Sequence, residues 1–196
     1  MFDGEGRSLG RIETGPLARP TGLAFDGFRS RLWVVETLAH RVRAFDLHGH
    51  ELARIGSRGA GPGEFNFPTR VALDESGGFW VTDSLNFRLQ HFDANGQYLS
   101  ELGSAGDRPG GFARPRGISV DGSGRIFVVD ALFDAIQIFD PTGQLLLIFG
   151  GRGEEPGEFW LPSDVIVDGH GHAFVSDAYN SRLQVFAYHP PERVTQ

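Results

Sequence analysis

The segment Pro20-Thr-Gly-Leu-Ala-Phe-Asp26 decides the fold, because it returns three times along the chain. It recurs as Pro68-Thr-Arg-Val-Ala-Leu-Asp74, Pro115-Arg-Gly-Ile-Ser-Val-Asp121 and Pro162-Ser-Asp-Val-Ile-Val-Asp168. Successive copies begin 48, 47 and 47 residues apart. The chain is therefore a tandem repeat, and each repeat is one unit of supersecondary structure.

Each copy of this segment is followed by three more segments of strand length. In the second repeat they are Phe79-Trp-Val-Thr-Asp83, Arg88-Leu-Gln-His-Phe-Asp93 and Gln97–Leu102. All are rich in Val, Ile, Phe or Trp, and Gly, Asp and Asn separate them, which is typical of strands and tight turns. Four strands per repeat without helical periodicity predict an all-β fold, a β-propeller built from four-stranded antiparallel blades.

The repeat sets the domain boundaries. We predict one propeller domain over residues 1–189 and a C-terminal tail over 190–196. Residues 1–19 are expected to form the outer strand and loop of a preceding or last blade, because Met1-Phe2-Asp3 aligns with Ala44-Phe45-Asp46. The last repeat is expected to lack its own outer strand. The four repeats are placed at 20–67, 68–114, 115–161 and 162–189.

The motifs within the repeats resemble those of the NHL-repeat family. The clearest copies are Val81-Thr-Asp83 with Asn86-Phe-Arg88, and Val175-Ser-Asp177 with Asn180-Ser-Arg182, together with the loops that end in Gly-Glu-Phe. The resemblance covers nearly all of residues 1–188. It implies a β-propeller, usually of six blades, and in bacterial members a sensor or scaffold role, often outside the cytoplasm.

The number of repeats is smaller than this resemblance implies. Six blades at this spacing need about two repeats more than the four in these 196 residues. Three readings follow: a partial propeller whose upstream blades are absent from this chain, a closed four-blade ring, or a ring assembled from two chains. An open arc would expose apolar blade faces and is expected to self-associate.

Composition narrows the class of partner. The formal net charge is −7, all eighteen basic residues are Arg, and they form no basic run, which disfavours nucleic-acid binding. The absence of Cys excludes disulfides and cysteine-based zinc sites. No apolar run approaches the ~20 residues that span a bilayer. The first residues do not resemble a signal peptide, so only the family resemblance favours a periplasmic or secreted location.

An acid and an Arg recur five residues apart in three repeats: Glu36 with Arg41, Asp83 with Arg88, and Asp177 with Arg182. We interpret these as structural pairs that fix the turn between the second and third strands, rather than as a ring of binding charges. The third repeat departs from the pattern, because Asp130 is followed by Ala135. Asp130 is therefore either a binding carboxylate or a solvated one.

The histidines are the candidate metal ligands. His48-Gly-His50 and His170-Gly-His172 lie in non-equivalent turns, and no third ligand is near in sequence. The innermost strands, where propeller lyases and lactonases hold their metals, contain no His or Glu here. We therefore predict surface histidines, with a metal pair as the alternative, and assign no metal, cofactor or catalytic residue.

The residues near the leading prolines and after the second strands are expected to ring the mouth of the central channel. A rim that mixes aromatic and charged side chains suits recognition of a protein or peptide. The predicted rim residues are His40, Arg70, Phe87, Arg116, Asp130, Phe133, Asp134, Asp164 and Tyr179.

The sequence thus predicts a non-catalytic module that binds a protein or peptide and acts as a scaffold or sensor domain. The alternative is a metal-dependent propeller lyase or lactonase whose active-site residues lie mostly in blades not present in this chain.

Overall fold

The computed structural model describes residues 3–188, which form fifteen strands in four antiparallel sheets. Each sheet is one blade, and its strands lie in sequence order from the innermost strand outward. In the described residues the first three blades have four strands and the fourth has three. Two 3-10 turns, η1 (Thr37–Ala39) and η2 (Ser84–Asn86), follow the second strands of the first two blades. The strands are β1 (Pro20–Asp26), β2 (Arg31–Glu36), β3 (Arg41–Asp46) and β4 (Glu51–Ile55) in blade 1; β5 (Pro68–Leu73), β6 (Phe79–Asp83), β7 (Arg88–Phe92) and β8 (Tyr98–Leu102) in blade 2; β9 (Pro115–Val120), β10 (Ile126–Asp130), β11 (Ala135–Phe139) and β12 (Leu145–Gly150) in blade 3; and β13 (Asp164–Val167), β14 (His172–Asp177) and β15 (Arg182–Ala187) in blade 4.

Asp residues recur at a regular spacing in the repeats because their side chains close the turns between strands. After β5, Oδ1 of Asp74 accepts hydrogen bonds from the backbone N–H groups of Ser76 and Gly78, at 2.8 and 3.0 Å. After β7, Oδ1 of Asp93 does the same for Asn95 and Gln97. Such side-chain-to-backbone bonds close a tight turn without help from the rest of the protein. The hairpin turns are therefore specified locally, which explains why they repeat.

Apolar side chains from facing blades form the core. Trp33 and Val42 of blade 1 pack against Phe79 and Phe92 of blade 2, and the same arrangement recurs between blades 2 and 3 and between blades 3 and 4. The Phe of each loop preceding the next blade is fully buried between the blades it connects. These three residues are Phe65, Phe112 and Phe159. Because one blade cannot bury both of its faces, the stacking of neighbours supplies most of the stability.

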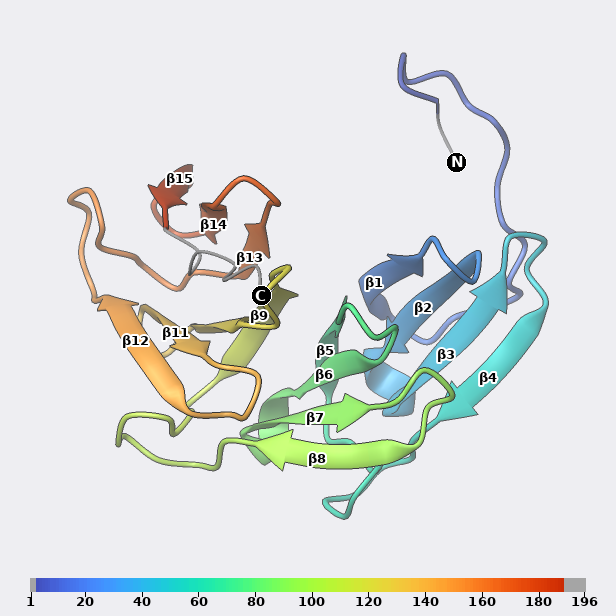
Figure 1. Ribbon diagram of the computed structural model, residues 1–196, viewed down its shortest axis with the longest axis horizontal. Coiled ribbons are helices and arrows are strands. Elements are labelled where there is room, and N and C mark those ends of the chain that lie inside the picture. Colours follow the sequence, from blue (N-terminus) through green and yellow to red (C-terminus); the bar gives the residue numbers. More distant parts are fainter. Residues whose placement is uncertain (1–2, 189–196) are drawn as a thin grey trace, which may run out of the picture.

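The four blades lie along an arc, with β1, β5, β9 and β13 side by side on its inner side (Figure 1). The outward faces of the two end blades are exposed. Leu23 on β1 is 64% exposed, and Leu183 on β15 is 73% exposed. Phe174 and Val185, which are paired across blade 4, are exposed as well. Blades 1 and 4 therefore do not pack on one another, and these four blades do not close a ring. The six blades usual for the resembling family are not confirmed.

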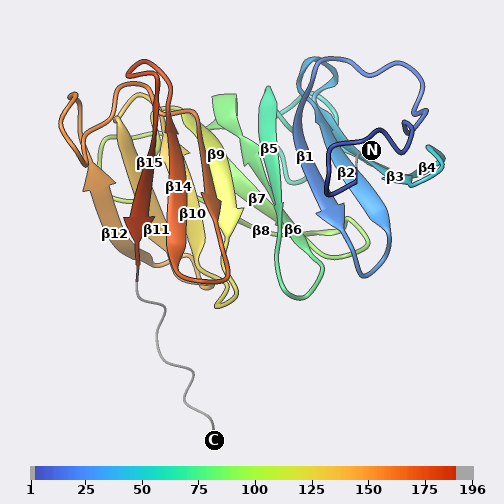
Figure 2. The same cartoon turned by 90° about the horizontal axis from the view of Figure 1, so that it is seen from above.

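The N-terminal segment differs from the prediction. No named strand lies between Asp3 and Arg19, so the predicted outer strand is not formed in the described part of the segment. Gly6, Gly10 and Gly15 have positive φ angles there, which breaks the extended path that a strand needs. The segment instead runs beside blade 1 (Figure 2). Residues 190–196 of the predicted tail lie outside the described residues, and within residues 3–188 no helix is long and apolar enough to cross a membrane.

Candidate functional site

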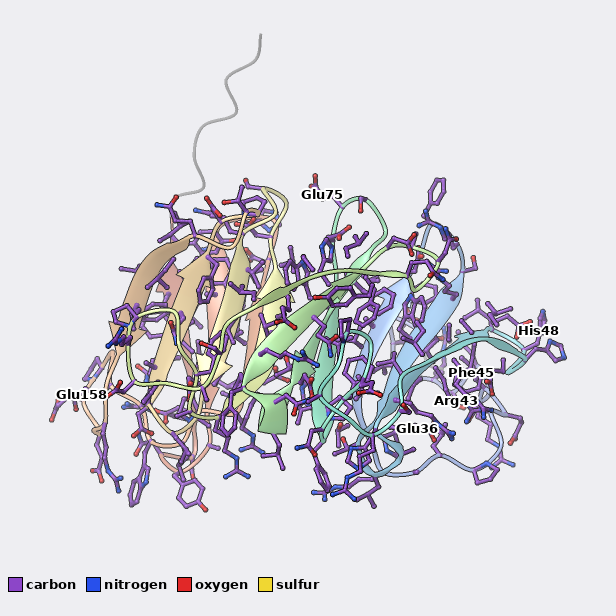
Figure 3. All side chains as sticks on the ribbon, turned by 90° about the horizontal axis from the view of Figure 1, so that it is seen from below. Glu36, Arg43, Phe45, His48, Glu75 and Glu158 are labelled. Carbon is purple, nitrogen blue, oxygen red and sulfur yellow. The ribbon has the colours of Figure 1, made fainter. Side chains whose placement is uncertain are left out.

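One end of the blades carries the candidate site. We call it the mouth surface and define it by the connections β2–β3, β6–β7, β10–β11 and β14–β15 and the residues on either side of the leading prolines. Glu36, at the end of β2, lies at this end, whereas Glu75, in the β5–β6 turn, lies at the opposite end (Figure 3). All nine predicted rim residues belong to segments that meet at this end.

The acid that ends each second strand anchors the loop leading into its blade. Asp83 accepts a hydrogen bond from the backbone N–H of Asn66 at 2.6 Å and another from Arg88 Nε at 2.9 Å. Glu36 and Asp177 make the equivalent bonds, with Arg41 at 2.6 Å and Arg182 at 2.7 Å. All three carboxylates are fully buried. The predicted structural role of the acid–Arg pairs is confirmed.

Ionisation of these buried acids depends on how completely the donors compensate for burial. Burial opposes ionisation of Glu36, but the hydrogen bonds from Arg41 and from the Ala18 backbone hold the pKa of this carboxyl below its ordinary value. At Asp83 burial has the larger effect and raises the pKa, although Asn66, Asn86 and Arg88 all donate to the carboxylate. The acid of the same motif therefore has a lowered pKa in blade 1 and a raised pKa in blade 2.

The sequence left two alternatives for Asp130 in blade 3, a binding carboxylate or a solvated one, and the structure supports neither. It is fully buried, and backbone N–H groups replace the missing Arg. Ala113 donates to Oδ2 at 2.7 Å and Arg114 to Oδ1 at 2.9 Å. Longer bonds come from Leu132 and Phe133. Asp130 holds the loop together and does not face solvent, so its place in an exposed rim is corrected.

The predicted placement of His40 and Asp134 in an exposed rim is corrected for the same reason. Both are buried, in equivalent positions after the second strand, and both have a left-handed backbone conformation. Nδ1 of His40 accepts a hydrogen bond from the Phe67 backbone at 3.2 Å, and Oδ1 of Asp134 accepts one from Leu161 at 2.6 Å. Each side chain thus links its blade to the start of the next. Among the aromatic rim residues, Phe87 and Phe133 are half-buried and Tyr179 is exposed.

Arg70 and Asp164 come together across the inner side of the arc. Arg70 Nε donates to Asp164 Oδ2 at 2.8 Å, which joins blade 2 to blade 4. Glycine allows this approach, because a Cβ on Gly117 of the intervening blade would lie 2.6 Å from the Asp164 Cα. A Cβ on Gly22 would lie 2.8 Å from the Arg70 Cα. Glycine and a charged residue thus alternate around the inner strands, and the charged side chains occupy the space that glycine leaves.

Two groups of residues at the mouth surface were not predicted from the sequence, apart from Tyr179 in the first group. The first is a set of exposed apolar tips, one per blade, two residues after each buried acid. Their constant offset in the sequence is the signal that could have revealed them. The tips are Leu38, Leu85, Leu132 and Tyr179, which are 56%, 44%, 54% and 64% exposed.

The second missed group consists of Arg19 and Arg114, which directly precede the leading prolines of blades 1 and 3. Together with the predicted residues Arg70 and Arg116 they line one pocket of about 210 Å³ at the mouth surface. Leu85 also lines this pocket, so it adjoins the apolar tips. The arrangement offers a cationic centre with apolar side chains around it.

The candidate metal ligands lie away from this pocket. His50 Nδ1 is 2.8 Å from Asp46 Oδ2, and His172 Nδ1 is 3.0 Å from Asp168 Oδ2, both in surface turns. These contacts contribute to lowering the pKa of each Asp to about 2. At Asp46 the hydrogen bond from the His50 ring lowers the pKa most. At Asp168 the hydrogen bond from the His172 backbone lowers it most. Within residues 3–188 no group of three or more His, Asp and Glu side chains could hold a metal ion.

Solved structures with the same architecture identify the fold. A catalytically inactive virginiamycin B lyase from Staphylococcus aureus, crystallised with quinupristin, superimposes with a TM-score of 0.65 at 14% identity, over 92% of this chain and 58% of the lyase. A protein of unknown function from Bacteroides thetaiotaomicron gives 0.66 at 18% identity, over 86% of this chain and 47% of that one. U3-55K gives 0.64 at 14%, over 92% and 55%. At these identities the likeness shows the fold alone, which is that of a β-propeller.

Residues 65–92 match the family model of the NHL repeat, and they lie in a fold of β-propeller blades. The matched segment runs from the buried Phe65 to the end of β7 and includes the Asp83–Arg88 pair. A comparison with curated protein sequences gives no match. The chain spans about half to three-fifths of the propeller structures that it resembles.

Proposed function

We propose that this chain is a non-catalytic binding module that holds an extended segment of a partner protein against its mouth surface, as a scaffold or sensor domain. The observation that carries the proposal is the set of exposed apolar tips Leu38, Leu85, Leu132 and Tyr179. The loops that carry Leu38 and Leu85 are held to the next blade by hydrogen bonds. Thr37 Oγ1 donates to the Pro68 carbonyl and Ser84 Oγ to the Pro115 carbonyl, both at 2.7 Å.

Rigid apolar side chains of this kind suit peptide recognition. A tip held on a fixed loop loses little conformational entropy when it is covered, so more of the burial energy contributes to affinity. Tyr179 packs beside Trp160, with ring centroids 5.7 Å apart, and presents the kind of aromatic anchor that dominates many interfaces. Since the tips recur once per blade, a peptide that crosses several blades would meet one anchor on each.

Selection from a random peptide library displayed on phage tests the proposal. Peptides enriched on the intact chain are synthesised, and their affinities are measured for Leu132→Asp and for Leu99→Asp. Leu99 lies on the outer strand β8 and is 54% exposed, as is Leu132, so the two substitutions differ chiefly in location. We expect Leu132→Asp to weaken binding about tenfold, while Leu99→Asp changes it less than about twofold. Equal effects of the two variants, or failure to enrich any peptide, would overturn the proposal.

We propose no reaction for this chain. The lyase among the similar structures shares 14% of its residues with this chain, which supports a common fold and does not carry over its chemistry.

A further inference from the structure

The pocket at the centre of the mouth surface combines four arginines without a lining carboxylate. Arg19, Arg70, Arg114 and Arg116 line it with hydroxyl and apolar residues, and within the part of the chain that the structure describes no Asp or Glu belongs to the lining. A cationic pocket of this kind is unexpected in a chain of net charge −7. The rest of the pocket lining is Thr21, Thr37, Phe67, Thr69, Ser84, Leu85 and Ser163.

Arg116 occupies a position at which neighbouring blades carry a hydroxyl. Thr21 Oγ1 donates to the Thr69 carbonyl at 3.0 Å, and Thr69 Oγ1 donates to the Arg116 carbonyl at 3.1 Å. These bonds link the inner strands of successive blades. Arg116 has no hydroxyl to donate to the corresponding residue of blade 4, Ser163, so the series of bonds ends there. A structural role therefore favours Thr at this position, and the guanidinium calls for another explanation.

Three of these arginines have guanidinium groups without an ion-pair partner in the part of the chain that the structure describes. Arg70 is paired with Asp164 at 2.8 Å. Within residues 3–188 the guanidinium groups of Arg19, Arg114 and Arg116 make no ion pair and no hydrogen bond. Burial, and then the positive charges of Arg114 and Arg70, lower the pKa of Arg116, while the nearby carboxylate of Asp164 acts in the opposite direction. The folded chain thus holds like charges close together, with Arg19 and Arg114 exposed to solvent and Arg116 half-buried, and a bound anion would reduce their repulsion.

We propose that Arg19, Arg114 and Arg116, with Arg70 held in place by Asp164, form a site for an oxyanion group carried by a peptide, either a carboxylate or a phosphoryl group. Guanidinium groups suit such a ligand because their planar donor pairs match two oxygen atoms of one anion. The pocket of about 210 Å³ admits an acidic side chain or a chain terminus. The site deepens the proposed function and rests on it in one respect: the exposed tips hold the peptide, and the arginines select its charge.

Fluorescence anisotropy of a fluorescein-labelled hexaglutamate peptide tests the site, with labelled hexaglutamine as the neutral probe. The variants are Arg116→Gln and Arg58→Gln. Arg58 lies in the loop after blade 1, is exposed, and makes no ion pair within the described residues, so Arg58→Gln removes the same charge outside the pocket. We expect binding of hexaglutamate over hexaglutamine, weakened about tenfold by Arg116→Gln and less than about twofold by Arg58→Gln.

Inorganic phosphate and a phosphoserine peptide, added as competitors, identify the source of the oxyanion. Displacement of hexaglutamate by both at lower concentration than by acetate indicates a phosphoryl group, and displacement by acetate at lower concentration than by phosphate indicates a carboxylate. Equal weakening by the two Arg variants, or no preference for hexaglutamate over hexaglutamine, would overturn the site. If library-selected peptides still bind Arg116→Gln but not Leu132→Asp, the anion site fails while the proposed function stands. If hexaglutamate binding depends on Arg116 and no peptide is selected through Leu132, the anion site stands and the proposed function fails.

Discussion

The isosteric substitution Asp130→Asn tests whether the exceptional acid of blade 3 is structural. The two carboxylate oxygens of Asp130 accept different backbone donors: Oδ2 accepts from Ala113 at 2.7 Å and Oδ1 from Arg114 at 2.9 Å. An asparagine side chain has one oxygen and one NH₂ group. Whichever way it is turned, the NH₂ group faces a backbone N–H, and one donor loses its acceptor inside the fold.

The expected loss of stability follows from this one unpaired donor. Leaving one buried donor without a partner destabilises a protein by about 1–3 kcal/mol. Asp140→Asn is the matched control, because the Thr142 and Gln144 backbone N–H groups both donate to Oδ1 of Asp140 in an exposed turn. The amide oxygen of an asparagine can keep both bonds, so we expect a change within about 0.5 kcal/mol.

Urea unfolding followed by tryptophan fluorescence measures both variants. We expect the unfolding midpoint of Asp130→Asn to fall clearly below that of Asp140→Asn, with the slope of the transition unchanged. Equal midpoints would refute the assignment, since a solvated or ligand-binding carboxylate at position 130 would tolerate the amide without loss of stability.

Three further predictions follow from the structure. Gly117→Ala should destabilise the fold by about 1–3 kcal/mol because its Cβ meets the backbone of the next inner strand, whereas Gly106→Ala, whose Cβ meets nothing within 4 Å, should be near neutral in the same urea assay. The Asp46 pKa, lowered from 3.8 to about 2, gives stability that is complete above pH 3.8 and is lost as the pH falls toward 2; an unfolding midpoint that does not change between pH 4 and pH 2 would contradict this. Sedimentation should show concentration-dependent self-association through the exposed faces of blades 1 and 4, reduced by Leu183→Arg but not by Leu146→Arg on the outer strand β12; a monomer at every concentration would argue against it.

The blades could be predicted from the sequence because their determinants are local and repeated. A leading Pro, an alternating strand and an Asp-based turn each specify their own backbone, and repetition at a 47-residue spacing separates the pattern from chance. The described residues 3–19 carry no named strand although the start of the chain aligns with the end of β3, because glycines with positive φ angles follow and a strand needs both a partner edge and an extended backbone.

The site was only partly predictable, because burial is a property of the assembled blades. Arg70, Arg116, Asp164 and Tyr179 were placed at the mouth surface from their distance to the leading Pro and the second strand. His40, Asp130 and Asp134 share those distances but turn inward to satisfy backbone N–H groups of neighbouring loops. Contacts between repeats decide which polar side chains accept these backbone hydrogen bonds. The sequence pattern within one repeat does not contain that information.

The most direct test of the mouth surface as the binding site is NMR observation of the arginine Nε–H signals during titration with hexaglutamate. Arg→Gln variants assign the signals. Binding in the pocket should shift the signals of Arg19, Arg114 and Arg116 first and saturably. The signals of two exposed arginines outside the pocket should stay in place, namely Arg58 and Arg108, which lies in the loop after blade 2. Shifts that spread evenly over the exposed arginines, or that spare Arg116, would contradict the account.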